Sequence, residues 1–429
     1  MSGGIARALV ALFLASLFAS SASAQSRGPD GMAGASQLLK ISGGSNPAAA
    51  AFAPSTWLEI ASLGGSAGND RLSLRDYRRW NGATWSEEDK REILARFHHG
   101  TLSLHAHGEM TPIRVGRPGW SIGLNGVAAA RAEVPRAWAE LALYGNAPGR
   151  RYRLDRLDGR AIAYTELAFT RAWMLRESWL SQLSRRLGFG ALLSEGIAVG
   201  ARLDLLHGWG FAEVTRSEGE LITTLDAVDG HAEVRSKSST GGVGIGLDLG
   251  LLARDARGWA VSLDARHLPA WIYWTSETEE HRSEVTADSL TLDQSGEDDL
   301  IDHRTVSMPT RHFRRALAPS LHLGLARRWE RWHLEADLDQ GLARSAETRT
   351  RPLGSIGAAL RADRHLELRT GLALGGVEGA VLGVGIGLSW RHLQVDLGLQ
   401  STGSLAIFEP RGLGAGLRMT IWPRPRGPM

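Results

Sequence analysis

A two-residue alternation of apolar and polar side chains recurs along this chain in segments of about ten residues. Between Val243 and Leu251 every second residue is Val, Ile or Leu, and the residues between them are mostly Gly, with one Asp. The segment from Trp332 to Asp339 repeats the pattern with His, Glu and Asp on the second face. This is the period of a β-strand with one apolar and one polar face, so the sequence predicts an all-β protein made of amphipathic strands.

Fourteen such segments can be placed, and an even number is what a single-chain bacterial outer-membrane barrel requires. A closed, transmembrane, antiparallel β-barrel also explains why half of each strand is polar, because that half faces water in the lumen. Strands are expected at residues 57–64, 101–109, 119–127, 160–170, 197–206, 241–251, 259–266, 318–327, 331–339, 355–362, 365–374, 381–390, 392–400 and 412–422.

The first residues have the order of a secretory signal peptide. Arg7 precedes an apolar run at residues 8–18, and small residues then lead to a cleavage site after Ala24. The apolar run is about half of the roughly 20 residues that a membrane-spanning helix needs. We therefore expect residues 1–24 to be a cleaved signal peptide, which leaves a soluble exported protein or an outer-membrane barrel, and the alternation favours the barrel.

Composition narrows the classes of partner. Cysteine is absent, so stability has to come from packing and backbone hydrogen bonds, and glycine is abundant at 52 residues. The formal net charge is only +3, and the lysines are limited to Lys40, Lys90 and Lys237. No basic stripe is present of the kind that a nucleic-acid partner needs, so nucleic acid is not expected. No cofactor is expected either.

The connections between the expected strands alternate in length. Short inner turns lie near residues 254–258, 328–331, 363–364 and 391, and long outer segments cover residues 207–240, 267–317 and 340–354. Outer-membrane barrels have short periplasmic turns and long extracellular loops, so this alternation supports the barrel. Residues 171–196 are too long for an inner turn, and they predict either a periplasmic helix from Trp173 to Leu187 or a missed hairpin.

Two outer stretches depart from the strand pattern. Ser86 followed by Asp89 resembles a capping box, and Ile93, Leu94 and Phe97 then supply an apolar face, which predicts a short helix in the first outer loop. Residues 277–302 carry ten acidic side chains. An acidic run of this kind predicts a solvated, mobile loop.

A glycine-rich stretch leading into Asn46-Pro47-Ala48 precedes the first expected strand. This segment resembles the N-terminal region of the FadL-like outer-membrane proteins, which include fatty-acid transporters and the PorV and TraF-like barrels. Shorter likenesses to the PorV-like branch occur at residues 201–208, 246–250 and 268–274. The resemblance implies a 14-stranded barrel over residues 56–422, an N-terminal plug over residues 25–55 with its motif at Asn46, Pro47 and Ala48, and a short tail at 423–429. The plug is brief for a transporter, and the tail follows Trp422 where many barrels end on an aromatic residue.

Charged residues of both signs fall on the faces expected to line the lumen. They can form a selectivity filter or a substrate path, or a structural lattice of Arg–carboxylate pairs that fills the interior. The second reading is favoured because barrel interiors are polar by default. The residues are Arg202, Asp204, Asp248, Asp264, Arg266, Glu335, Asp337, Glu367, Arg369, Asp396 and Arg418.

Other candidate motifs favour ordinary structural roles. A histidine group at residues 98, 99, 105 and 107 lacks the Cys or acidic residues that complete a metal site, so no metal is expected. Gly383, Gly385 and Gly387 alternate with apolar residues, which indicates a strand rather than a phosphate loop. Nine tryptophans near strand ends predict aromatic girdles at the membrane interfaces, namely Trp57, Trp120, Trp259, Trp271, Trp274, Trp329, Trp332, Trp390 and Trp422.

The leading function is passage of a small hydrophobic molecule across the outer membrane, and this follows mainly from the resemblance. The alternative is a non-conducting, PorV-like scaffold or secretion-accessory barrel that binds secretion or surface proteins through its outer loops. An enzyme is not expected, because no Ser/His/Asp set falls in a nucleophile-elbow context. The expected partners are outer-membrane lipid and, in the first reading, a hydrophobic small-molecule ligand.

Overall fold

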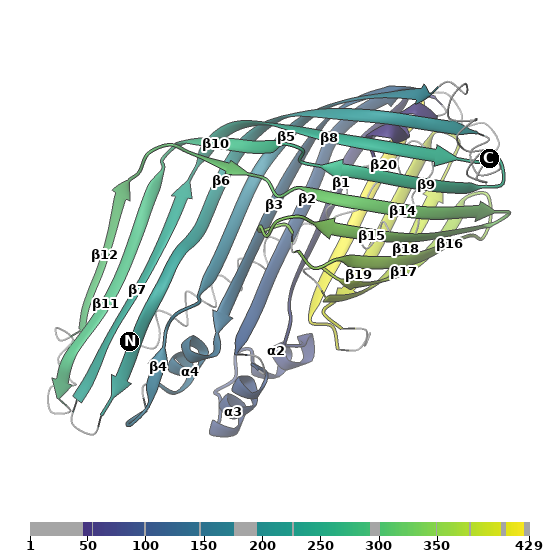
Figure 1. Cartoon of the computed structure of the whole chain (residues 1–429). Coiled ribbons are helices and arrows are strands. Elements are labelled where there is room, and N and C mark those ends of the chain that lie inside the picture. The colour runs from purple at the N-terminus through teal and green to yellow at the C-terminus, as the bar shows by residue number, and fades with distance from the viewer. Residues whose placement is uncertain are drawn as a thin grey trace, which may run out of the picture.

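The computed structural model describes residues 46–53, 55–97, 100–145, 147–175, 195–224, 227–291, 301–348, 350–376, 379–404 and 409–423. Its 20 strands form one continuous antiparallel sheet, and 14 of them close into a barrel because β1 pairs with β20 (Figure 1). In order around the wall these are β1 (Trp57–Asn69), β2 (Thr101–Arg117), β3 (Trp120–Pro135), β5 (Asp158–Leu175), β6 (Gly196–Thr223), β8 (Gly241–Arg254), β9 (Trp259–Arg266), β14 (Ser320–Trp329), β15 (Trp332–Gly341), β16 (Leu353–Arg361), β17 (Leu366–Gly375), β18 (Gly379–Ser389), β19 (Leu393–Thr402) and β20 (Gly412–Ile421).

All fourteen expected strand segments coincide with these barrel strands, so the predicted fold class is confirmed. The structure extends several of them, most of all β6, which is 28 residues long. Closure pairs nine residues of β1, from Leu58 to Gly68, with residues of β20. The chain thereby satisfies the backbone hydrogen bonds of the barrel's first and last strands, which is the condition for placing strands in lipid.

The outward faces of the barrel strands are apolar. On β14 the outward Leu321, Leu323 and Leu325 are 39–49% exposed, whereas the inward Ala326 is buried. The same pattern repeats on β6, β9, β15, β17 and β19. An apolar surface of this extent would be unstable in water, so the wall faces lipid, as expected for an outer-membrane barrel.

The two ends of the barrel differ in the length of their connections. The strands from β14 to β20 are joined at one end by short turns, such as residues 330–331 and 362–365. β20 also ends here, since its last residue Ile421 pairs with Leu393 next to a short turn. We assign this end to the periplasm because short turns face it in barrels of this class. The long connections therefore lie on the extracellular side.

The same sheet extends beyond the extracellular end of the barrel as a projecting sheet. The last part of β6 pairs with β4 (Arg151–Arg153) and β7 (Ala227–Ser239), β7 pairs with β11 (Glu279–Thr291), and β11 pairs with β12 (Ile301–Pro309). In Figure 1 these strands project away from the barrel at the lower left. The prediction of a mobile acidic loop at residues 277–302 is therefore wrong for residues 279–291, because cross-strand hydrogen bonds and ion pairs order them. Residues 292–300 lie outside the described residues.

Two neighbouring wall strands are interrupted near their extracellular ends. β9 stops at Arg266 and the wall resumes with β10 (Ala270–Ser276), while β13 (Phe313–Ala316) stops short of β14. β10 pairs with β8 on one side and with β13 on the other. A proline lies in each interruption, Pro269 and Pro319, and proline cannot donate a ladder hydrogen bond.

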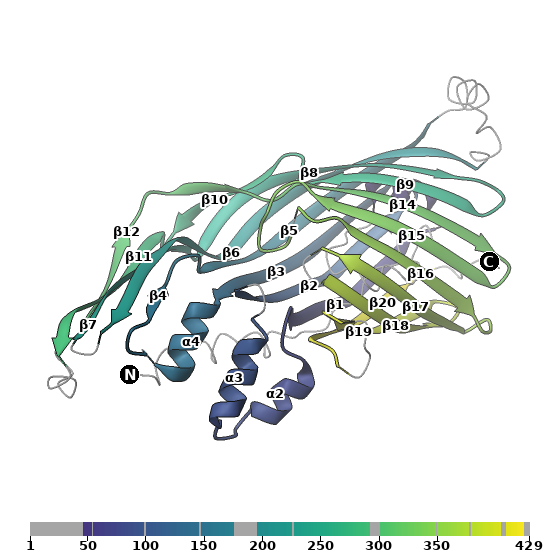
Figure 2. The same ribbon diagram turned by 60° about the horizontal axis from the view of Figure 1, so that its bottom comes forward.

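Three helices cover the extracellular rim near β1 to β3 (Figure 2). They are α2 (Leu74–Trp80), α3 (Glu87–Ala95) and α4 (Arg136–Tyr144). The helix predicted in the first outer loop is confirmed as α3, whose capping box joins Ser86 and Asp89. Ile93 and Phe97 pack against Trp80 of α2 in a small apolar core, so these helices are held by side-chain packing as well as by their caps.

Among the described residues, no helix has the length and apolarity that would let it cross a membrane. The helix expected from Trp173 to Leu187 is wrong at its start, because Trp173 to Leu175 belong to β5. The rest of that helix lies at residues 176–187, outside the described residues, as does the expected signal peptide.

Candidate functional site in the barrel interior

The charged residues predicted to line the lumen all lie on the inward face of the wall. Ten of the eleven are buried, and Arg266 is 18% exposed. They form a belt in the periplasmic half of the barrel in which nearly every guanidinium meets a carboxylate. Strand alternation explains the placement, because an outward apolar residue forces both of its neighbours inward.

Arg202 on β6 is the centre of the largest group in the belt. Its Nη2 lies 2.8 Å from Glu166 Oε2, and its Nε lies 2.8 Å from Asp204 Oδ1 and 3.4 Å from Asp248 Oδ2. These acids come from β5, β6 and β8, which are adjacent in the wall. One guanidinium therefore binds three strands together, and Glu166, which sequence reasoning missed, is part of the same group.

Glu59 on β1 joins the first and last parts of the chain. Its Oε2 lies 3.5 Å from both Arg114 Nη1 on β2 and Arg418 Nη2 on β20. Glu59 is fully buried and was not predicted, because the first strand alternates too weakly to identify its inward face. The closure of the barrel thus carries a buried ion pair as well as the backbone ladder.

The belt continues through β9, β14 and β15. The ring of His322 bridges two acids, with Nδ1 2.7 Å from Asp264 Oδ1 and Nε2 3.0 Å from Asp337 Oδ1. Asp264 also lies 3.2 Å from Arg266 Nε. The sequence identified the two acids and the arginine but not the histidine between them.

On the last strands, Arg369 of β17 reaches across β18 to β19. Its Nη2 lies 2.7 Å from Asp396 Oδ1, and its Nε lies 2.7 Å from Glu367 Oε1. The intervening Gly387 leaves room for this pair, since a Cβ there would lie 2.8 Å from Arg369 Nη2. The glycine alternation at residues 383–387 therefore serves a strand, as predicted, and makes space for an ion pair inside the barrel.

The Asn-Pro-Ala segment lies against the inner wall at the periplasmic end. A short 3₁₀ helix, η2 (Pro47–Phe52), packs against Ala198 and Leu252 of β6 and β8. Asn46 Nδ2 donates hydrogen bonds to the carbonyl oxygens of Leu251 and Leu263, at 2.9 and 3.2 Å. Its Oδ1 accepts from the backbone N–H of Ala48, so the asparagine both caps the helix and attaches it to the wall.

Two glycines make this docking possible. A Cβ at Gly200 would lie 2.3 Å from the backbone of Pro47 and Ala48, and one at Gly250 would lie 2.0 Å from Asn46 Oδ1. The structure thus places the predicted motif residues inside the barrel. The remainder of the expected plug, residues 25–45, lies outside the described residues.

An apolar cluster on the inner wall was missed by the sequence analysis. It lies on the extracellular side of the ionic belt, and its largest members are fully or almost fully buried. Alternation identifies the inward face of a strand only where one face is apolar and the other is polar. Where both faces are apolar, the sequence alone does not show which side chains point into the barrel. The cluster contains Ala129, Ile162, Tyr164, Leu206, Phe211, Ala270, Ile272, Trp274, Leu317 and Ala346, with Val127 and Phe313 packed against it.

The connection between β15 and β16 folds inward over this cluster. Ala346 is one of the cluster residues, and Tyr164 Oη donates a 3.2 Å hydrogen bond to Glu347 Oε2. Burial raises the pKa of the Glu347 carboxyl above its ordinary value. Arg344 fixes the connection to the rim, with Nη2 2.8 Å from Glu133 Oε1 and 2.9 Å from Asp158 Oδ2. This part of the predicted outer loop therefore covers an apolar surface.

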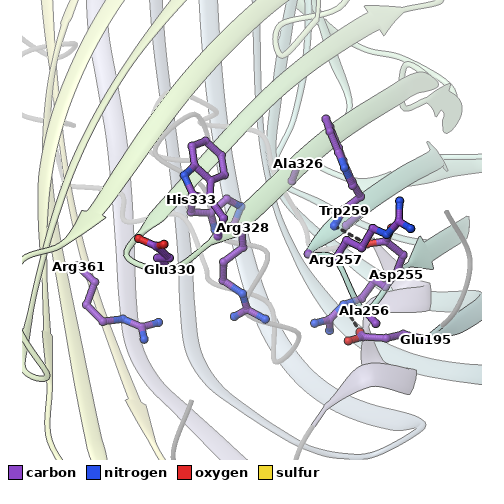
Figure 3. Close-up of a pocket in the computed structure, with 14 residues that line it drawn as sticks. Glu195, Asp255, Ala256, Arg257, Trp259, Ala326, Arg328, Glu330, His333 and Arg361 are labelled. Carbon is purple, nitrogen blue, oxygen red and sulfur yellow. Dashed lines mark hydrogen bonds and ion pairs between the residues drawn. The ribbon is translucent and has the colours of Figure 1, made fainter. Parts of the chain in front are cut away.

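A pocket of about 460 Å³ opens at the periplasmic end (Figure 3). It lies between the β8–β9 turn, the β14–β15 turn and the end of β16, and it is lined by both signs of charge. Arg254 Nε lies 3.5 Å from Glu195 Oε2, and Asp255 accepts a 2.7 Å hydrogen bond from the Trp259 backbone N–H. Glu195, Arg254 and Asp255 therefore help to fix the turns at this pocket.

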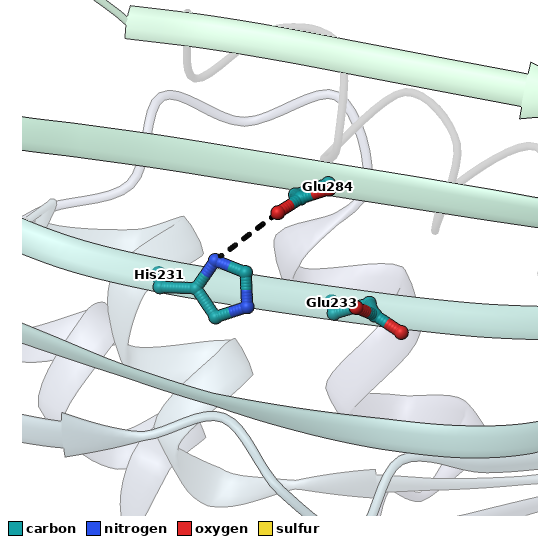
Figure 4. Close-up of side chains that lie close together, drawn as sticks. All are labelled: His231, Glu233 and Glu284. Atoms are coloured by element: carbon teal, nitrogen blue, oxygen red, sulfur yellow. Dashed lines mark ion pairs between the residues drawn. The ribbon is translucent and has the colours of Figure 1, made fainter.

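One group of potential metal ligands lies on the projecting sheet (Figure 4). The ligand atoms of His231, Glu233 and Glu284 all lie within 4.8 Å of one another. Arg282 Nη2, however, lies 2.9 Å from Glu233 and 3.2 Å from Glu284. A hydrogen bond from Arg235 also holds the pKa of Glu233 below its ordinary value. Because guanidinium groups already bind both carboxylates, we interpret the group as a cross-strand ion-pair network.

The remaining candidates are the histidine group and the tryptophans near strand ends. His105 and His107 share one face of β2, whereas residues 98 and 99 lie outside the described residues. The girdle prediction is wrong for Trp57, Trp274 and Trp422, which are at most 4% exposed and point inward. The two-residue period of a strand does not by itself show whether a tryptophan at the strand end points into the barrel or toward lipid.

The comparisons with known proteins concern the fold. No protein-family model matches the chain, and no curated protein does. Among solved structures, the Pseudomonas putida toluene transporter TodX is 12% identical, with 88% of this chain and 91% of that chain covered and a TM-score of 0.44. The Ralstonia pickettii toluene transporter TbuX is 9% identical, with 94% and 98% covered and a TM-score of 0.45. A Pseudomonas aeruginosa FadL homologue is 10% identical, with 88% and 92% covered and a TM-score of 0.46. These three similarities, two to toluene transporters and one to a FadL homologue, concern the fold of the barrel alone, and they do not show the PorV-like likeness expected from the sequence.

Proposed function

We propose that the barrel passes small, neutral, hydrophobic molecules across the outer membrane, and that the inward apolar cluster around Trp274 is where they first bind. The observation that supports this most is the cluster itself. The inside of a barrel is polar by default, because it faces water. A contiguous set of inward aromatic and aliphatic side chains is therefore a surface that favours a hydrophobic ligand over water.

The cluster lies where such a molecule would enter. It is on the extracellular side of the ionic belt and under the connection that carries Ala346 and Glu347. Phe211, Trp274 and Phe313 form a run of aromatic contacts, with ring centroids 5.5 and 5.3 Å apart. Movement of the covering connection would expose this aromatic surface to the outside.

The ion pairs in the belt below the cluster argue against a filter that selects ions. Its arginines are matched by carboxylates at 2.7–3.5 Å, so much of the charge is balanced within the wall. A filter for ions needs charges that remain available to the permeating ion. We also propose that the N-terminal residues export the protein as a signal peptide. The barrel then conducts molecules without catalysing a reaction.

The test compares uptake of two tracers of similar size, one neutral and aromatic and one a sugar. Phe211→Ser combined with Ile272→Ser should reduce uptake of the aromatic tracer by about tenfold, because two buried contacts of the cluster are lost. Uptake of the sugar should not fall. The control variant is Trp85→Ser, which changes a 41% exposed residue outside the barrel and should leave both rates unchanged.

Heat-modifiable migration on gels verifies that each variant forms the barrel. If the double variant forms the barrel and takes up the aromatic tracer at the wild-type rate, the cluster is structural and the proposal is wrong. A scaffold that binds secretion proteins was the other candidate, and no specific observation in the described residues favours it.

A further inference from the structure

We propose that the periplasmic rim of the outer wall binds anionic phospholipid, with Arg117, Arg171 and Arg327 contacting the headgroup phosphates. These arginines come from three strands, β2, β5 and β14, close to their periplasmic ends. They are separate from the luminal belt and from the apolar cluster. The inference therefore does not depend on what passes through the barrel.

Each of the three side chains points toward lipid. On β14 the inward Ala326 is buried, while the outward Leu325 is 45% exposed, and Arg327 continues the outward series. On β5 the outward Leu167, Phe169 and Trp173 are 36–48% exposed, and Arg171 belongs to the same series. The guanidinium groups thus lie where the apolar band ends, at the level of lipid headgroups.

Tryptophan rings hold these guanidinium groups at the surface. Arg327 Cζ lies 4.9 Å from the ring centroid of Trp259 and 5.4 Å from that of Trp329. Arg117 and Arg171 lie 5.1 and 5.8 Å from Trp120 and Trp173. An indole prefers the membrane interface, and it covers one face of the cation while the N–H donors at its edge stay available.

Within the part of the chain that the structure describes, the charge on these arginines has no carboxylate partner. Among the described residues, none of the three forms an ion pair with a carboxylate, in contrast to Arg202, Arg369 and Arg418 of the belt. A planar guanidinium forms strong, bidentate hydrogen bonds with phosphate. An unpaired guanidinium next to exposed apolar side chains fits a phosphate that carries acyl chains better than it fits a free anion.

The periplasmic rim as a whole, these three arginines included, strengthens this electrostatic attraction. Within the described residues, the rim positions carry ten arginines against four carboxylates. Cations near an anionic bilayer surface each contribute about 1 kcal/mol to its attraction. The arginines are at positions 117, 171, 254, 257, 327, 328, 331, 361, 364 and 391, and the carboxylates are at 195, 255, 330 and 363.

The test measures lipid retained by the full-length protein. Wild type is equilibrated with mixed phosphatidylglycerol and phosphatidylcholine nanodiscs, released, and analysed by native mass spectrometry. We expect phosphatidylglycerol to be enriched, Arg327→Gln to lower this enrichment about fivefold, and the combined Arg117→Gln, Arg171→Gln and Arg327→Gln variant to abolish it.

The matched control is an arginine at the extracellular rim, on β13 beside β10, the short strands that follow β9 and precede β14 in the wall. Arg314 lies 5.5 Å from the ring of Trp271, also without a carboxylate partner among the described residues, but at the extracellular end. Arg314→Gln should keep the enrichment, and Arg327→Lys should retain part of it. Equal retention by wild type and the triple variant, or an equal loss in Arg314→Gln, would overturn the proposal.

A second measurement covers the case in which the triple variant does not fold. The unfolding temperature of wild type is compared in phosphatidylcholine nanodiscs with and without phosphatidylglycerol. Phosphatidylglycerol should raise it, and high salt should cancel the increase, because salt screens exposed charges. The absence of any increase at low salt would equally contradict the proposal.

Discussion

The two parts of β6 differ in what surrounds them, although they are one continuous strand. From Gly196 to Gly208 it pairs with β5 and β8 inside the barrel, and from Phe211 to Thr223 it pairs mainly with β7 in the projecting sheet. In the barrel part, Leu203 and Leu205 point outward, 43% and 47% exposed, beside buried charges. In the projecting part, residues such as Arg216 and Glu218 are exposed and polar.

This difference shows that the alternation of apolar and polar residues reflects what surrounds the strand, lipid outside and water inside, rather than strand geometry itself. Lipid requires an apolar outward face, and the lumen permits a polar inward face, so the barrel part alternates strictly. Beyond the membrane both faces of a sheet can be polar. The alternation therefore identified the fourteen barrel strands, whereas β4, β7, β11 and β12 outside the barrel and the short β10 and β13 were missed.

The largest expected difference between the two parts concerns their arginines. Arg202→Ala leaves Glu166, Asp204 and Asp248 without their shared cation, and it should cost about 3–5 kcal/mol of unfolding free energy. Arg216→Ala breaks only the pair with Glu218, whose side chains are 53% and 44% exposed, and should cost less than about 1 kcal/mol. Urea unfolding in lipid vesicles measures both, and similar costs would show that the belt is not a buried network.

A smaller effect is expected at the docking site of the Asn-Pro-Ala segment. Gly200→Ala places a methyl group 2.3 Å from the backbone of Pro47 and Ala48, and such overpacking should cost about 1–3 kcal/mol. The displaced η2 should then become accessible to protease. Gly354→Ala is the control, because nothing lies within 4 Å of its Cβ. If proteolysis near residues 46–53 does not increase in Gly200→Ala, the segment is not held by this contact.

The smallest effect is expected outside the membrane, in α3. Hydrogen bonds from the Ser86 side chain and backbone hold the pKa of Asp89 below its ordinary value of 3.8. A depressed pKa means that the cap contributes stability above about pH 4 and loses it as the pH falls through the folded-state value. Hydrogen exchange of α3 amides should therefore accelerate on acidification below pH 4.

Ser86→Ala provides the matched variant for this helix. It should cost about 1 kcal/mol of local stability at neutral pH and weaken the acid dependence. The barrel strands should keep their exchange protection in both experiments. Loss of protection in β1 or β2 together with α3 would show that the outer helices and the wall unfold as one unit.

Some charged residues of the candidate site could be predicted from the sequence, and others could not. Asp248, Asp337 and Asp396 were identified because each lies between two apolar residues in a strict alternation. Glu59, Glu166 and His322 complete the same ion pairs and were missed, because a contact across strands depends on register. Register is set by the pairing of strands that lie far apart in the sequence, as with Glu59 and Arg418.

The sequence by itself determined the strands that cross the membrane and, on the strands that alternate strictly, the face that carries charge, because the bilayer imposes a period of two on a crossing strand. Only the tertiary structure decided that β1 closes on β20, which guanidinium meets which carboxylate, and that Trp274 points inward with Phe211. It also decided that Asn46 bonds to the wall at Leu251 and Leu263. The physical reason is that these features join residues that are distant in the sequence. The pattern of a single segment carries no information about which other segment it contacts.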